Sequence, residues 1–226
     1  NLSNVRIHKA KQIGVNVIGS NSLITQTIVS NTGVGSSNNS HGHGFHSYHS
    51  TSHSNCLVSV EAFNGYNDIS NSGKKGGNAD GFSIKYFSHN FTFIDAHAHH
   101  NTDDGFDFWK AGFDSKSNAN TSNIRIFYST ANFNGKHPFE KNGDGNGFKM
   151  GSKDKYQRPK VDEGKREIYG SASCHNLARG FDRNGTKMII DAINLNAKGN
   201  GKGNYQDIRF KGQKDSYKLK CSMFPK

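Results

Sequence analysis

The sequence is poor in apolar residues and in proline, and it contains no long hydrophobic run. Only 32% of its 226 residues are hydrophobic, and three are proline. No apolar stretch approaches the roughly 20 residues that a membrane-spanning helix needs, so we expect no membrane association. So small an apolar fraction does not suit a helical bundle. The 26 glycines and the many asparagines instead suit short strands that are joined by turns.

Cysteine and acidic residues are also scarce. Cys56, Cys174 and Cys221 are odd in number and lack metal-ligand spacing, so we expect buried thiols, with room for one disulfide. The 18 acidic and 29 basic residues give a net charge of +11. A basic surface favours a polyanion, which could be nucleic acid, anionic lipid or an acidic polysaccharide. Charge leaves this choice open, but scattered lysines without a zinc-finger or RNA-binding motif argue against nucleic acid.

An octet that starts with a large apolar residue, alternates and ends in asparagine recurs along the chain. Stacking such octets at about 4.8 Å would give each one a neighbour above and below, with the asparagines bonded in a ladder. We therefore predict an all-β fold, a right-handed parallel β-helix of about seven coils that forms one domain over residues 1–226. The copies are Ile24–Asn31, Val60–Asn67, Ile94–Asn101, Phe127–Asn134, Tyr169–Asn176 and Ile189–Asn196, and Tyr217–Phe224 keeps the alternation without asparagine.

The two ends of the predicted solenoid differ from its middle. A degenerate first coil is expected near Val5–Val17, and no amphipathic helix precedes it as a cap. We therefore expect that upstream coils or an N-terminal cap could be missing from this chain.

A Gly-Phe pair recurs after the asparagines, and its neighbours carry chemistry. We interpret each pair as one turn per coil, with glycine at the tight bend and phenylalanine in the core. Equivalent residues of successive coils should stack in columns, so that the aspartates converge on one external face and the lysine and the arginine lie one and two coils further on. The pairs begin at Gly81, Gly105, Gly147 and Gly180; the residues before them are Asp80, Asp104, Asn146 and Arg179, and those after them are Ser83, Asp107, Lys149 and Asp182.

Four aspartates are predicted to share this face: Asp80, Asp103, Asp104 and Asp107. Clustered carboxylates are costly unless a cation binds them. Hard oxygen ligands at flexible spacing suit Ca²⁺ better than zinc or copper. We therefore predict that these four bind Ca²⁺. The alternative is a set of solvated turn aspartates.

Three motifs resemble those of the family 9 polysaccharide lyases, the pectate lyases of the β-helix fold. They are Asn78–Phe82 (NADGF), Asn101–Trp109 (NTDDGFDFW) and Asp144–Gly151 (DGNGFKMG), within a resemblance that runs from about Asn55 to Asn184. The resemblance implies that the four aspartates bind Ca²⁺ and that Lys149 is the catalytic base. It implies a secreted lyase that cleaves an acidic, uronate-containing polysaccharide, first of all pectate (polygalacturonate), by β-elimination.

Several expectations accompany this resemblance. Arg179 is a candidate to hold a substrate carboxylate by a two-pronged contact, and we expect a monomer. Members of the family are usually longer, which leaves the N-terminal subsites in question. A lysine base must be neutral, whereas its reference pKa is about 10.4. The sequence does not fix the sign of the shift, but it favours activity at alkaline pH.

Two other functions compete with the lyase. Gly42–Gly44 (GHG) and Asn101–Asp104 (NTDD) resemble motifs of polygalacturonase-like glycoside hydrolases, although their order is reversed here. A non-catalytic β-helical adhesin or carbohydrate-binding protein would explain the ladder and the charge, but not a lysine beside the aspartates.

Three longer segments carry expectations of their own. The stretch Ser40–His53 (SHGHGFHSYHSTSH) is expected to be a flexible loop, or else a transition-metal site. The long loops Lys110–Asn123 and Lys149–Lys165 are expected to shape the substrate groove.

Overall fold

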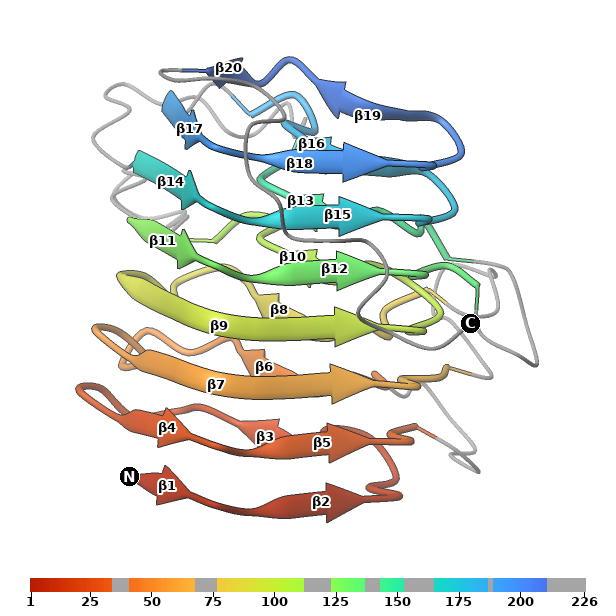
Figure 1. Ribbon diagram of the computed structural model, residues 1–226. Helices are drawn as coiled ribbons and strands as arrows, with labels where there is room; N and C mark the ends of the chain where they lie inside the picture. The colour runs from red at the N-terminus through yellow and green to blue at the C-terminus, as the bar shows by residue number, and fades with distance from the viewer. Residues whose placement is uncertain are drawn as a thin grey trace.

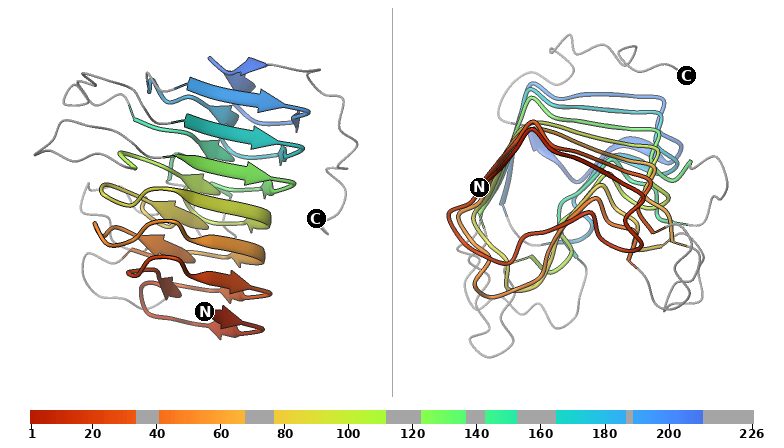
Figure 2. Two further views of the ribbon diagram at one scale, coloured as in Figure 1. Left: turned by 90° about the vertical axis from the view of Figure 1, so that its left-hand side faces the viewer. Right: turned by 90° about the horizontal axis from the view of Figure 1, so that it is seen from below.

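The computed structural model describes residues 1–33, 41–67, 77–111, 123–136, 143–152, 165–186 and 189–210. Over these residues the chain forms a parallel β-helix, in which each coil adds parallel strands to a large sheet and a small sheet (Figure 1). Seen along its axis, the coils nearly superimpose (Figure 2). In this part of the chain no helix has the length and apolarity that crossing a membrane requires. The predicted fold class is confirmed.

The large sheet has two arms that meet at a corner. β7 (Cys56–Phe63) and β9 (Phe91–His99) run through both arms, whereas the other coils place a separate strand in each. The first arm also contains β1 (Leu2–Ser3), β4 (Leu23–Thr25), β11 (Ile124–Phe127), β14 (Lys165–Tyr169), β17 (Ile189–Ile193) and β20 (Arg209–Phe210); the second also contains β2 (Arg6–His8), β5 (Ile28–Ser30), β12 (Thr130–Asn132), β15 (Ala172–Cys174) and β18 (Asn196–Lys198).

The small sheet contributes one strand to each of seven successive coils. All of its pairings are parallel, so equivalent residues of neighbouring coils stand directly beside one another. The prediction of about seven coils agrees with this sheet, and the expected first coil is present. The strands are β3 (Val15–Asn16), β6 (Phe45–Ser47), β8 (Phe82–Ile84), β10 (Phe106–Asp107), β13 (Phe148–Lys149), β16 (Arg179–Asp182) and β19 (Gly203–Gln206).

The corner between the two arms is made in the same way in every coil. One residue adopts a left-handed conformation there, with φ of 54° at Asp95, 52° at Tyr128 and 56° at Gly170. Each lies one place after a residue paired in the first arm. A left-handed residue is costly for a side chain with a Cβ. Stacking on neighbours with the same bend must therefore compensate, and it repeats the corner from coil to coil.

The predicted Gly-Phe register is confirmed, and it builds the core. Phe82, Phe106, Phe148 and Phe181 are paired in that order, are fully buried or nearly so, and their rings stack with centroids 4.6 to 4.9 Å apart. Gly44-Phe45 is a further pair, which the sequence analysis missed inside the histidine-rich stretch.

Gly81, Gly105 and Gly147 lie at bends just before the strands of the small sheet, as predicted, whereas Gly180 lies inside β16. These glycines have no left-handed φ. A Cβ at Gly105 would lie 2.7 Å from the carbonyl oxygen of Gly147 and 2.9 Å from Cβ of Ala131. At the bend of Gly105, glycine is therefore required by the close approach of the next coil and of the opposite sheet, and not by a left-handed backbone.

The asparagine ladder exists, but half of its predicted members were misplaced. Asn101 Nδ2 donates to Asn134 Oδ1, Asn134 Nδ2 to Asn176 Oδ1, and Asn176 Nδ2 to Asn200 Oδ1, at 2.9 to 3.0 Å. Asn200 therefore takes the place predicted for Asn196, which lies in β18.

At the N-terminal end of the ladder, the register puts Thr32 and Gly65 in this column in place of Asn31 and Asn67. Asn31 instead lies at a left-handed corner, with φ of 53°. The octets were matched on their asparagines, and the outer copies slipped by a few residues because asparagine also favours such corners.

Other expectations concern the thiols and the loops. Cys56 is a free, half-buried thiol, whereas Cys174 is disulfide-bonded. The octet Tyr217–Phe224 and most of the two predicted specificity loops lie outside the described residues.

Candidate functional site

The site lies where the strands of the small sheet begin and end. Asp80 comes two residues before β8, and Asp103 and Asp104 come just before β10. Asp107 and Lys149 are the last residues of β10 and β13 and are paired in register. The parallel pairing thus brings together side chains that are far apart in sequence, as the Gly-Phe column predicted.

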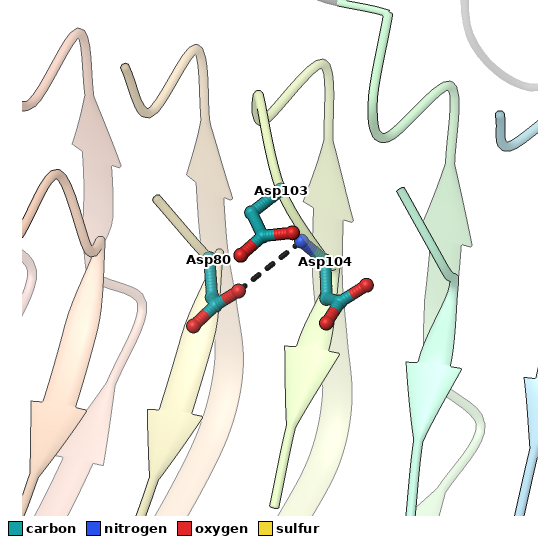
Figure 3. Close-up of side chains that lie close together, drawn as sticks. All are labelled: Asp80, Asp103 and Asp104. Atoms are coloured by element: carbon teal, nitrogen blue, oxygen red, sulfur yellow. Dashed lines mark hydrogen bonds between the residues drawn. The ribbon is translucent and has the colours of Figure 1, made fainter. Parts of the chain in front are cut away.

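Three of the four predicted aspartates form a compact group. One carboxylate oxygen from each of Asp80, Asp103 and Asp104 lies within 4.8 Å of the other two, and Figure 3 shows the three side chains together. The Asp104 backbone N–H donates to Asp80 Oδ1 at 3.1 Å, and Asp103 accepts from the backbone N–H groups of Asn78 and Asp144. These backbone donors hold the carboxylates in place although their charges repel.

The fourth aspartate, Asp107, joins the group through two lysines. Lys85 Nζ lies 3.0 Å from Asp107 and 3.2 Å from Asp80. Lys149 Nζ lies 3.0 Å from Asp104, 3.0 Å from Asp144 and 3.9 Å from Asp107. Five carboxyls therefore face two ammonium groups. Except for the more exposed Asp144, these side chains are buried.

The charge balance of this cluster leaves room for a cation. With all groups ionised, five carboxylates exceed two ammonium groups by three negative charges. Burial, followed by the charge of Asp80, raises the pKa of Asp103 to about 7. Both causes disfavour the charged form of this carboxyl, and a nearby cation would offset them. Hard carboxylate oxygens around such a site fit a divalent cation such as Ca²⁺.

Lys149 is strongly affected by the same carboxylates. Burial alone would lower its pKa, but the charges of the surrounding carboxylates, Asp104 first, together outweigh burial and raise the pKa well above the ordinary value. The sign that the sequence left open is therefore upward in the metal-free protein. A cation among these carboxylates would reduce their effect and move the pKa of Lys149 back down.

Arg179 lies one coil beyond Lys149, as the register predicted. Its guanidinium contacts Asp182 at 3.1 Å, and its side chain is 35% exposed. Among the described residues that line the cavity at the cluster, Arg179 is absent. The structure thus does not bring it into the same site as Lys149.

Sequence reasoning missed three members of the site. Lys85 lies three residues after Phe82, in the register position of Trp109. Asp144 lies within the third lyase-like motif. The third is His43, whose Nδ1 accepts a hydrogen bond from the Asp80 backbone N–H at 3.2 Å. The Gly44-Phe45 pair was the signal that could have placed His43 in the column of Asp80 and Asp104.

The histidine-rich stretch is a wall of the site and not only a loop. His41, His43 and His46 stack with nearly parallel rings, with centroids 5.2 and 4.9 Å apart between neighbours. Burial lowers the pKa of His43 to about 4, although Asp80 opposes this shift. Burial likewise lowers the pKa of His46 to about 2. Both rings are therefore neutral near neutral pH.

A cavity of about 630 Å³ opens over the cluster. Asp103, Asp107, Asp144, Lys85 and Lys149 form one side of it. Histidine and aromatic rings also line it, namely His41, His43, His46, Tyr48, Tyr86 and Trp109, together with Gly77, Asn78 and Gly143. Its size is in the range of cavities that bind small molecules or segments of a polymer.

The fold and the site define a parallel β-helix that carries a carboxylate and lysine cluster in a surface cavity. The family model described as the Pel9A-like, right-handed β-helix region matches residues 1–215. The chain therefore belongs to this family, which confirms the predicted resemblance and the right-handed winding.

Two solved structures share this fold. A pectate lyase, Pel9A, has a TM-score of 0.67 and 23% identity, over 91% of this chain and 46% of its own. A rhamnogalacturonan lyase has a TM-score of 0.54 and 22% identity, over 87% of this chain and 47% of its own. The chain thus spans about half the length of these lyases. Among the curated proteins, no match is found.

Proposed function

We propose that this β-helix cleaves an acidic, uronate-containing polysaccharide by calcium-dependent β-elimination, with Lys149 as the base. The observation that carries the proposal is the position of Lys149. Its amine lies at the wall of the cavity and within 4 Å of three carboxylates. The two lyases of the same fold support the reaction class.

Asp80, Asp103, Asp104 and Asp107 would hold the Ca²⁺ ion. When bound, the ion would neutralise the substrate carboxylate and stabilise the negative charge that develops beside it. The backbone N–H groups of Asn78, Asp104 and Asp144 fix the carboxylates, so that they need not rearrange during the reaction.

Lys149 would take the proton from C5 of the uronate. The electrons of that C–H bond form the double bond between C4 and C5, and the glycosidic oxygen leaves from C4. One product therefore ends in an unsaturated uronate. A neutral lysine is required for this step, so we expect higher activity at alkaline pH.

Polygalacturonate is our first choice of substrate, and rhamnogalacturonan is the next. Such polysaccharides lie outside cells, so we also expect a secreted protein. The basic net charge of +11 would favour either polyanion.

The test is to incubate the protein with each polysaccharide and Ca²⁺ and to follow the ultraviolet absorbance of the unsaturated product. EGTA should abolish the signal, and excess Ca²⁺ should restore it. New reducing ends without the absorbance would indicate the polygalacturonase-like hydrolase instead. Binding without any cleavage, with the fold intact, would indicate a carbohydrate-binding protein and contradict the proposal.

A further inference from the structure

A row of aromatic side chains runs from the carboxylate cluster toward the N-terminal coils. Tyr48 directly follows β6, and Tyr86 and Trp109 each lie two residues after β8 and β10. The rings of Tyr48 and Tyr86 meet edge to face with centroids 5.0 Å apart, and those of Tyr86 and Trp109 do so at 5.2 Å. All three line the same cavity as Lys149. They form what we call the aromatic wall.

The aromatic wall is more exposed than its ring types usually are. Tyr48 is 53% exposed, and Tyr86 and Trp109 are half-buried. A row of large rings on the wall of a cavity is a typical feature of a binding surface. A pyranose ring has an apolar face of C–H groups that can pack on such rings, while its hydroxyls stay in water.

A positive charge accompanies these rings. Lys110 Nζ lies 4.5 Å from the ring centroid of Trp109 and 5.7 Å from that of Tyr86. The cation and the aromatic faces stabilise each other. An acidic sugar offers both parts of a complementary ligand, a ring to pack on the wall and a carboxylate for the lysine.

The wall is also tied to the reaction site. The Trp109 backbone N–H donates to Asp107 Oδ1 at 2.9 Å. The rings belong to three successive coils, and Lys149 lies on the coil that follows Trp109. A sugar chain that passes Lys149 and runs along the helix axis toward the N-terminus would therefore lie along the wall.

We propose that Tyr48, Tyr86, Trp109 and Lys110 form a binding subsite for uronate residues. These are the residues of the polymer that extend from the cleaved bond toward the N-terminal coils of the protein. This inference rests on the proposed function for its ligand class. It assigns binding of the polymer to aromatic side chains that line the same cavity as the carboxylate cluster but lie on its N-terminal side. The variants Trp109→Ala and Tyr86→Ala should then weaken substrate binding and affect the chemical step much less.

Trp109 is the one tryptophan of the chain, which makes its fluorescence a direct probe. The Lys149→Ala variant, with Ca²⁺, should be titrated with uronate oligosaccharides of increasing length. We expect a saturable change in emission that becomes tighter with length, and a Kd about five to ten times higher when Tyr86→Ala is added. In the active protein, Trp109→Ala should raise KM for long oligomers more than for a dimer. Tyr128→Ala is the matched control, since Tyr128 is 53% exposed and does not line the cavity.

The outcomes separate this inference from the proposed function. Normal elimination, together with unchanged Trp109 emission and an unchanged KM in Trp109→Ala, would overturn the subsite and leave the lyase. Saturable emission changes without any elimination by the unmodified protein would keep the subsite and overturn the lyase. Equal losses of binding in Tyr86→Ala and Tyr128→Ala would show a general effect on folding and would also overturn the subsite.

Discussion

Lys149 is a residue whose surroundings determine what it can do. Its ammonium group is paired with Asp104 and Asp144, and these carboxylates raise its pKa. Without a cation it stays protonated and serves only to balance charge. The same side chain thus balances the carboxylates of the metal-free site; under the proposed function it would accept a proton once a cation neutralises them.

Replacement of Lys149 should separate these two roles. Lys149→Ala should lower kcat by about 10²- to 10⁴-fold, the usual contribution of a positioned base. Lys149→Arg should be as inactive, because arginine stays charged, while its cation still pairs with Asp104. Rates of product formation, together with melting temperatures, would check this.

The matched control is Lys198→Ala, which removes an exposed lysine in β18. It should leave both the rate and the melting temperature unchanged. A rate near that of the unmodified protein in Lys149→Arg would contradict the assignment of this residue as the base.

At the scale of elements, the ladder of asparagines joins one coil to the next. Asn134 Oδ1 accepts from both the backbone N–H and Nδ2 of Asn101, and Asn134 Nδ2 donates to Asn176 Oδ1 and to the carbonyl of Ala98. The side chain is fully buried. All of its hydrogen-bonding capacity is therefore used inside the turn that leads to the strand of the carboxylate site.

Asn134→Ala should lower the free energy of unfolding by about 3 kcal/mol, because it leaves several buried polar partners unsatisfied. Urea denaturation would measure the loss. Asn16→Ala removes an exposed asparagine of β3 and should change stability by less than about 0.5 kcal/mol. Equal effects of the two substitutions would mean that the ladder adds no more than a surface residue does.

At the scale of the whole molecule, the site should couple folding to pH and, under the proposed function, to Ca²⁺. Asp103 has its pKa raised from 3.8 to about 7 in the folded, metal-free protein. Because the pKa of Asp103 is higher in the folded state than in the unfolded state, its contribution to stability is full at low pH, where the group is protonated in both the folded and the unfolded protein. That contribution is lost as the pH rises from about 4 through about 7.

The stabilisation by Ca²⁺ should therefore increase over the same range, since the ion replaces the lost proton. Melting temperatures in EGTA and in Ca²⁺, measured from about pH 5 to about pH 8, should diverge as the pH rises. The Asp103→Asn variant should show a much flatter difference. A difference that is independent of pH in the unmodified protein would contradict the carboxylate site.

The repeating part of this protein could be predicted from its sequence. Equivalent residues of a parallel β-helix stack one coil apart, so the recurring Gly-Phe pair predicted two columns. Asp80 and Asp104 lie in the column before the glycine, and Asp107 and Lys149 lie in the column after the phenylalanine. The same reasoning found Asn101, Asn134 and Asn176, because there the octets are in register.

Contacts between side chains of different columns became evident only in the folded chain. Lys85 reaches Asp80 and Asp107 from a turn that no repeat marks, and His43 belongs to a coil that was hidden in a stretch rich in histidine. The register of Asn200 depends on pairing and not on spacing. The physical reason is that stacking fixes order along the helix axis, which the sequence repeats record. Contacts between side chains from different turns depend on the length and path of each turn, and the sequence repeats do not record these.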